Sequence, residues 1–220
     1  MTKAEVLQWI RTRALVPVLR AGHEEQAMAL AEAIIAAGID VLEVTMTVPG
    51  ALLVMRRLAR EWPDVLIGAG TVLDPETARA CIDEGAQFIV SPALNIKTVE
   101  FCRQSSIAVL PGALTPTEIV TAWQAGADVI KVFPADAMGG PAYLRSLKRP
   151  LPQIELTPTG GVSPATAKHY LEAGAFALGI GSDLVDTRAI AEGHPETITE
   201  RARVYLQIVA DFQAEASIKS

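Results

Sequence analysis

The clearest pattern along the chain is an alanine-rich, helix-like run that ends at a glycine and opens directly into apolar residues. It occurs four times, in AAGIDVLEV (36–44), DEGAQFIVS (83–91), QAGADVIKV (124–132) and EAGAFALGI (172–180). Glycine readily takes the left-handed conformation that often ends a helix. Each copy therefore predicts the end of a helix followed by a buried strand.

Four further apolar runs lie between these copies and bring the number of predicted strands to eight. They are LVPVLR (15–20), VLIGAGT (65–71), IAVLPG (107–112) and QIELTPTGG (153–161). A helical stretch follows each strand, and several of these stretches open with an N-cap residue and a proline. Examples of such openings are Asp74-Pro75, Thr115-Pro116 and Ser163-Pro164.

Near-continuous apolar strands indicate burial on both faces, as in parallel sheets that helices cover. Eight alternating strand–helix units predict an α/β fold, a single (β/α)8 TIM barrel, rather than an open doubly wound sheet. We expect a short N-terminal helix within residues 1–14, and the barrel within 15–220 with a closing helix around 195–215. The whole chain, 1–220, is thus expected to form one domain.

Composition narrows the class of protein further. Half of the 220 residues are hydrophobic, which suffices for a large core, and the formal net charge is −6. An acidic chain without a stripe of Lys and Arg is not expected to bind nucleic acid. No membrane span or signal peptide is predicted, and Cys81 and Cys102 are too few for a disulfide framework. We therefore expect a cytoplasmic protein.

Two charged residues interrupt the apolar strands where neither can reach water by facing outward. Glu43 lies in VLEVTM of the second predicted strand, and Lys131 lies in DVIKVFP of the sixth. Even-numbered barrel strands contribute to the same interior layer, and these two strands lie opposite each other. The two side chains can therefore meet across the centre. The alternative is a buried ion pair that only fills the core. Such a pair is seldom more stable than well-packed hydrophobic side chains in the same place.

The same pair is suited to covalent chemistry on a carbonyl group. Loss of water favours the neutral amine of a lysine, which can attack a carbonyl and form a Schiff base. A nearby carboxyl group can then move protons during dehydration and at the substrate carbon and hydroxyl. We interpret Lys131 as the nucleophile and Glu43 as the general acid and base.

A second group of candidate residues follows the seventh and eighth strands. The two segments are Thr159-Gly160-Gly161-Val162-Ser163-Pro164 and Gly179-Ile180-Gly181-Ser182. Glycines let backbone amides approach an oxyanion, and these two loops are the usual phosphate site of such barrels. The sequence therefore predicts a phosphorylated ligand.

Candidates for a substrate carboxylate end the first and third strands. Arg20 offers a guanidinium fork, and Gly68-Ala69-Gly70-Thr71 offers a hydroxyl beside open backbone. The alternative for Arg20 is a salt bridge at the rim. Because the histidines are not at metal-ligand spacing, we expect no metal. They are His23, His169 and His194.

These motifs resemble those of one enzyme family, and they extend over nearly the whole chain. The family is the 2-keto-3-deoxy-6-phosphogluconate (KDPG) aldolases, also called 4-hydroxy-2-oxoglutarate (KHG) aldolases. The matching stretches, in order, are LEVT with Glu43, GAGTV at 68–72, IVSP with Pro92, PG at 111–112, IKVFPA with Lys131, PTGG at 158–161 and GSDLV at 181–185.

The resemblance implies a class I aldolase that cleaves KDPG to pyruvate and glyceraldehyde 3-phosphate, or KHG to pyruvate and glyoxylate. It implies a Schiff base between Lys131 and pyruvate, with Glu43 as the acid and base. It further implies that the enzyme needs no cofactor and is a homotrimer. The implied pocket residues are Thr71, Pro92, Phe133 and Thr159, and the implied phosphate ligands are Gly160, Gly161, Gly181 and Ser182.

The chain departs from some family members near the second strand. Those members carry an arginine where this chain has Thr47, and they often lack the arginine that is Arg20 here. Our hypothesis is that Arg20 supplies the same charge from a neighbouring strand. Because the arginine position differs, the 6-phosphogalactonate (KDPGal) epimer is an alternative substrate. Two other classes of function are consistent with the barrel. One is a phosphosugar epimerase that uses Glu43 only as a base, and the other is a non-catalytic sugar-phosphate sensor.

Overall fold

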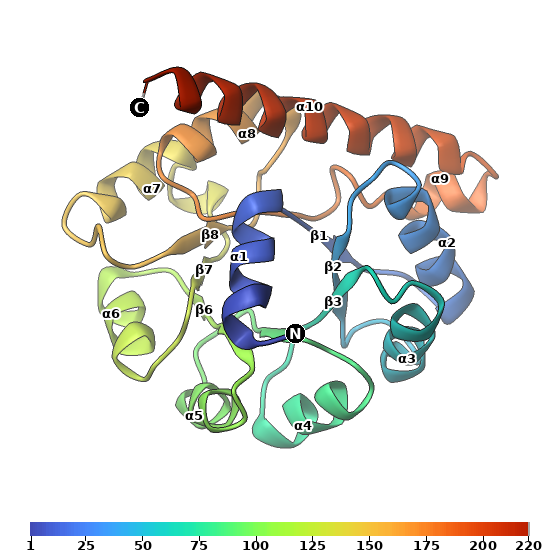
Figure 1. Ribbon diagram of the computed structural model, residues 1–220, viewed down its shortest axis with the longest axis horizontal. Coiled ribbons are helices and arrows are strands. Elements are labelled where there is room, and N and C mark those ends of the chain that lie inside the picture. The colour runs from blue at the N-terminus through green and yellow to red at the C-terminus, as the bar shows by residue number, and fades with distance from the viewer. Residues whose placement is uncertain (220) are drawn as a thin grey trace.

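The computed structural model of the chain, which describes residues 1–219, has the predicted alternation of strands and helices. The strands are β1 (Leu15–Leu19), β2 (Val41–Thr45), β3 (Leu66–Gly70), β4 (Phe88–Val90), β5 (Ala108–Leu110), β6 (Gly112–Ala113), β7 (Ile130–Val132), β8 (Leu156–Pro158) and β9 (Leu178–Ile180). The helices are α1 (Lys3–Arg13), α2 (Glu24–Ile35), α3 (Ala51–Glu61), α4 (Pro75–Asp83), α5 (Ile96–Gln104), α6 (Pro116–Gln124), α7 (Pro141–Lys148), α8 (Pro164–Glu172), α9 (Thr187–Ala191) and α10 (Pro195–Lys219). Figure 1 shows the helices arranged around the strands.

The strands form two parallel sheets that meet at both ends. Their orders are β5-β4-β3-β2-β1-β9 and β6-β7-β8. The predicted fifth strand is divided at Pro111, which has no N–H to donate, but the Pro111 carbonyl still accepts from the amide of Lys131 at 2.9 Å. At the other junction, Thr159 forms a parallel bridge with Gly179. The fold is therefore the predicted TIM barrel, with one interrupted strand that the sequence did not indicate.

The helices begin where the N-cap pattern predicts. The side chain of Asp74 accepts a hydrogen bond from the amide of Thr77 at 2.7 Å, and Thr115 forms a capping box with Glu118. Ser163 forms a third cap at the start of α8. These three caps fix the residue at which their strand-to-helix loops end, and the loops after the strands carry the candidate site.

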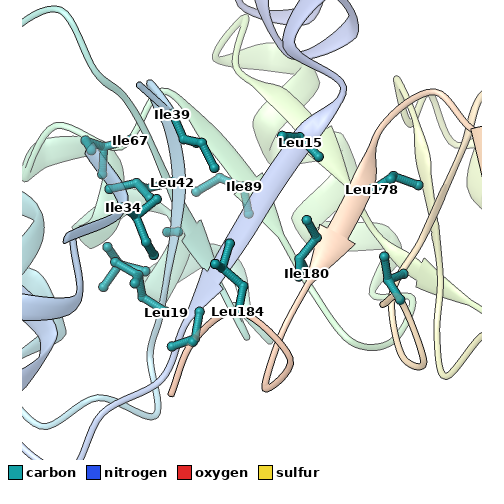
Figure 2. Close-up of a cluster of buried hydrophobic side chains, with 14 of the residues drawn as sticks. Leu15, Leu19, Ile34, Ile39, Leu42, Ile67, Ile89, Leu178, Ile180 and Leu184 are labelled. Carbon is teal, nitrogen blue, oxygen red and sulfur yellow. The ribbon is translucent and has the colours of Figure 1, made fainter. Parts of the chain in front are cut away.

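Alternate side chains along the strands pack outward against the helices. In Figure 2, Leu15 and Leu19 of β1 lie in one cluster with Leu42 of β2 and with Ile34 of α2. All of these side chains are nearly or fully buried. Burial of a side chain of this size contributes about 1.5–3 kcal/mol, so this layer is the main source of stability.

The intervening side chains point into the barrel and fill its lower half. Val16, Val41 and Leu66 are early residues of their strands, and they pack with Val6 and Ile10 of α1. In Figure 1, α1 lies across the centre of the ring of strands. The predicted N-terminal helix therefore plugs the amino ends of the strands, which leaves the carboxyl ends for a site.

Three helical segments differ from the sequence expectation. The closing helix α10 extends to Lys219, beyond the expected end near residue 215. The five-residue α9 and a 3₁₀ turn at Asp136–Met138 were not predicted, because segments this short carry no helical periodicity. Among the described residues, no helix combines the length and the apolar character that crossing a membrane requires.

The α1 plug leads to a prediction for stability. Ile10 is fully buried, so Ile10→Ala should lower the free energy of unfolding by about 2–5 kcal/mol, through lost burial and the cavity that remains. Urea denaturation followed by circular dichroism measures it. Leu53→Ala is the control, since Leu53 is 44% exposed and should cost less than about 0.5 kcal/mol. Equal effects of the two changes would contradict the plug.

Candidate active site

The two buried charges meet inside the barrel. The Nζ atom of Lys131, on β7, donates to Oε1 of Glu43, on β2, at 3.4 Å. Lys131 is 4% exposed and Glu43 is 2% exposed. The predicted contact across the barrel is thereby confirmed. Each side chain compensates the charge of the other. Burial of either charge without its partner would cost roughly several kcal/mol.

The two glycines of the GAG segment make room for Glu43 and for the ring below it. A Cβ atom on Gly70 would lie 2.0 Å from Oε1 of Glu43. A Cβ atom on Gly68 would lie 2.2 Å from the ring of Phe88, which fills the layer below. Both glycines occupy inward-facing positions of β3, next to β2. The absent side chain of Gly70 therefore leaves the space in which the Glu43 carboxylate lies, and that of Gly68 leaves the space of the Phe88 ring.

A cavity of about 230 Å³ opens above the pair, at the carboxyl ends of the strands. It brings together the two predicted phosphate loops, Arg20 after β1 and Phe133 after β7. The Phe133 ring centroid lies 5.6 Å from Nζ of Lys131, which links the cavity to the amine. The lining residues are Val18, Arg20, Phe133, Thr159, Gly160, Gly161, Val162, Ser163, Gly181, Ser182 and Asp183.

The loop after β8 depends on its glycines. Gly160 and Gly161 have φ values of +99° and +67°. Residues other than glycine rarely adopt such φ values. A Cβ atom on Gly161 would also meet Cβ of Asp136 at 2.4 Å. The loop thus presents bare backbone at the cavity, immediately before the capped start of α8. This is the arrangement that binds oxyanions.

Two threonine hydroxyls on the inner wall lack hydrogen-bond partners. The Oγ1 atoms of Thr157 and Thr159 are buried and unpaired. Thr157 is the register partner of Lys131, and Thr159 lines the cavity. A buried hydroxyl without a partner is uncommon, so these two groups are available to a polar ligand.

Two predicted pocket residues lie at the carboxyl ends of the strands but outside the lining of that cavity. Thr71 follows β3 with φ of +59°. This conformation is strained for a β-branched residue, and residues with such strain are common at functional sites. Pro92 follows β4, and its carbonyl carbon and oxygen lie 2.2 Å from where a Cβ of Gly112 would be. The structure therefore places them on the opposite side of the barrel mouth from the phosphate loops.

Sequence reasoning missed three parts of the cavity wall. Val18 looked like an ordinary strand residue, and Val162 like an ordinary loop residue. Asp183 stood inside the GSDLV segment, but nothing in its spacing marked it as a cavity residue. Only the closure of β1, β8 and β9 around one space brings them together.

The two cysteines and His23 have structural roles. Burial raises the pKa of the Cys81 thiol to about 11 and that of the Cys102 thiol to about 12, so both stay protonated at neutral pH. Both cysteines are free, as expected. His23 caps α2 by accepting from the amide of Gln26. None of these groups faces the cavity.

Comparison with known proteins shows the family of the chain. A family model described as "Aldolase: KDPG and KHG aldolase" matches residues 6–201. The chain belongs to this family. It is therefore an aldolase, a carbon–carbon lyase, and the resemblance seen in its motifs is confirmed.

Individual relatives of this aldolase match over nearly their full length. The chain is 36% identical to the KHG/KDPG aldolase of Escherichia coli (strain K12), over 92% of this chain and 94% of that protein. It is 35% identical to the 2-dehydro-3-deoxy-phosphogluconate aldolase of Treponema pallidum (strain Nichols), over 95% and 98%.

Solved structures agree with these matches. The KDPG aldolase of Legionella pneumophila, with pyruvate captured as a covalent carbinolamine, superposes with a TM-score of 0.84 at 32% identity, over 93% of this chain and 98% of that chain. The 3-hexulose-6-phosphate synthase of Salmonella typhimurium superposes at 0.72 but is 17% identical, over 90% and 99%. The second match concerns the fold alone.

The packing of Gly70 against Glu43 leads to a prediction for catalysis. Gly70→Ala should displace the carboxylate and lower kcat/KM for aldol cleavage by about 100-fold or more, because small misplacements of reacting groups are costly. Steady-state kinetics measures the effect. In Gly22→Ala the added Cβ would meet its nearest atom at 3.6 Å, so this control should keep its activity. Wild-type kinetics for Gly70→Ala would refute the proposed role of this contact.

Proposed function

We propose that this aldolase cleaves KDPG to pyruvate and glyceraldehyde 3-phosphate through a Schiff base on Lys131, and KHG to pyruvate and glyoxylate at the same site. The observation that carries the proposal is the buried Lys131–Glu43 contact of 3.4 Å, next to Phe133 of the cavity wall. The covalent carbinolamine in the Legionella relative supports the same chemistry.

The first half of the reaction forms the covalent intermediate. Glu43 takes a proton from the ammonium of Lys131, and the neutral amine attacks the C2 carbonyl carbon of the substrate. Glu43 then returns a proton to the carbinolamine hydroxyl, which leaves as water. The product is an iminium ion that can accept the electron pair of the C3–C4 bond.

The second half breaks the carbon–carbon bond. Glu43, again a carboxylate, takes the proton of the C4 hydroxyl, the C3–C4 bond breaks, and the aldehyde leaves. The enamine that remains on Lys131 takes the proton held by Glu43 at C3. Water then hydrolyses the resulting iminium, which releases pyruvate and restores the ammonium of Lys131 and the carboxylate of Glu43. One carboxyl group can serve every step because it lies beside the reacting nitrogen.

The two ends of the substrate are held by different parts of the barrel mouth. The phosphate lies at Gly160, Gly161, Gly181 and Ser182, where bare backbone precedes the start of α8. The pyruvate carboxylate lies toward Thr71 and Pro92, at the ends of β3 and β4. Phe133 and Thr159 line the space between, and the unpaired Thr159 hydroxyl faces the sugar hydroxyls.

Arg20 is the cationic side chain among the described residues that line the cavity. We assign it the charge that other members place near Thr47. Thr47 cannot supply that charge, because its side chain is a neutral hydroxyl, which shares a hydrogen bond of 2.7 Å with Thr45. Arg20 therefore holds an anionic end of the substrate from the β1 side of the mouth.

A second candidate is cleavage of the KDPGal epimer. A solved structure described as native KDPGal matches with a TM-score of 0.83 at 33% identity, over 91% of this chain and 96% of that chain. The combination of Arg20 with Thr47 also departs from some KDPG-type members. The ratio of kcat/KM for the two epimers decides between them. An epimerase, in contrast, would need no covalent lysine.

The assembly and location are part of the same proposal. We assign a homotrimer from the family resemblance, and one structural neighbour, 32% identical, is a cage designed by fusing symmetric oligomeric domains. Its TM-score is 0.84, over 93% of this chain and 75% of that chain. A cytoplasmic location agrees with the two free, buried cysteines. Light scattering after size-exclusion chromatography measures the mass of the assembly.

The assignment of Arg20 gives a kinetic prediction. Arg20→Ala should raise KM for KDPG by about 10–100-fold with little change in kcat, because hydrogen bonds to charged groups contribute about 1.5–3 kcal/mol. Arg20→Lys should recover part of the loss. Arg60→Ala, at an exposed position of α3, is the control. An unchanged KM for Arg20→Ala would reject the assignment.

Borohydride trapping tests the covalent mechanism. We expect the protein, incubated with pyruvate and reduced, to carry one adduct that maps to Lys131 by peptide mass spectrometry. Lys148 and Lys168, in the same digest, should stay unmodified and serve as internal controls. No adduct on Lys131, in protein that still binds sugar phosphate, would overturn the aldol mechanism in favour of an epimerase or a sensor.

A further inference from the structure

The closing helix α10 reaches the phosphate cavity through one buried side chain. Tyr205 has 0% of its surface exposed. Its hydroxyl donates to Oδ1 of Asp183 at 2.5 Å and lies 3.4 Å from the carbonyl oxygen of Val162. Asp183 belongs to the loop after β9, and Val162 to the loop after β8. One hydroxyl therefore contacts both candidate phosphate loops.

The two contacted residues are part of the cavity wall. Asp183 and Val162 both line it and adjoin the proposed phosphate ligands Ser182 and Gly161. A second bond from α10 holds the same loop, because Nη1 of Arg201 donates to the carbonyl oxygen of Asp183 at 2.7 Å. The separation of the loops, and with it the width of the cavity, is therefore set from α10.

The charge of Asp183 gives the contact a further role. A carboxylate in the wall of a phosphate site would repel the phosphate and weaken binding. The short hydrogen bond from the buried Tyr205 binds Oδ1 of Asp183 to the protein and so fixes the position of this carboxylate in the wall. Burial and the nearby Asp183 carboxylate both raise the pKa of the Tyr205 phenol, so its hydroxyl remains a donor at all physiological pH values.

We propose that Tyr205 is a positioning residue for phosphate recognition: its hydroxyl holds the loops after β8 and β9 at the separation that accepts a phosphate group. Tyr205 does not touch the substrate, and it lies outside the Lys131–Glu43 chemistry. The inference rests on the proposed phosphate-binding role of these loops. It predicts that loss of the hydroxyl impairs binding of phosphorylated substrates selectively.

Tyr205→Phe is the direct test, because it removes the hydroxyl and keeps the buried ring. We expect KM for KDPG and the inhibition constant of inorganic phosphate to rise together by about 10-fold or more. The value of kcat should change by less than about two-fold. Turnover of KHG, which carries no phosphate, and borohydride trapping of pyruvate on Lys131 should stay at wild-type levels.

A matched control and a double variant make the test specific. Tyr170, on α8, is also buried at 1% exposure, and its hydroxyl makes none of the bonds that join the two loops. Tyr170→Phe should therefore leave KM for KDPG unchanged. Asp183→Ala combined with Tyr205→Phe should be no worse than the more severe single change, because both remove the same bond.

The outcomes separate this inference from the proposed function. Wild-type enzyme that inorganic phosphate does not inhibit competitively would reject the phosphate role of the loops, and this inference with it. Competitive inhibition of the wild type, with unchanged constants in Tyr205→Phe, would reject the role of Tyr205 alone. Equal losses on KDPG and KHG would overturn it too, since they indicate general damage to the barrel.

Discussion

The contact between Lys131 and Glu43 is the constraint on which the rest of the interior depends. A barrel core excludes water, so neither charge is tolerated without the other, and removal of one partner would cost about 3–5 kcal/mol. The pair also needs space, which β3 provides at Gly70, where a Cβ atom would lie 2.0 Å from Oε1 of Glu43. In the proposed mechanism the same contact places a proton acceptor 3.4 Å from the nitrogen that forms the Schiff base. Stability and reactivity thus depend on the same two residues.

The direction of the strands decides where this pair becomes useful. All strand pairs are parallel, so the amino ends gather at one mouth and the carboxyl ends at the other. The helix α1 covers the first mouth with Val6 and Ile10, below an apolar layer. The pair lies above that layer, and the loops that follow the strands surround it. Substrate can therefore approach the amine only from the loop side.

The fold itself does not specify the reaction. A protein that is 17% identical, the 3-hexulose-6-phosphate synthase, shares the barrel with a TM-score of 0.72. The features of the present chain that bear on chemistry are a lysine and a glutamate in contact across the barrel, together with glycine-rich loops at one side of the mouth. The aldolase assignment therefore rests on side chains and their spacing, as it does for most barrel enzymes.

The sequence by itself determined the alternation of strand and helix, the two charges in the core and the glycine-rich loops. Each of these is local, because periodicity, caps and turns act over a few residues. Only the tertiary structure decided that Gly70 makes room for Glu43, that Pro111 interrupts a strand and that Asp183 meets Tyr205 across 22 positions of the chain. These contacts depend on how the ring closes and on how α10 packs over it. No local pattern encodes that geometry, since contacting residues far apart in sequence leave no periodic signal.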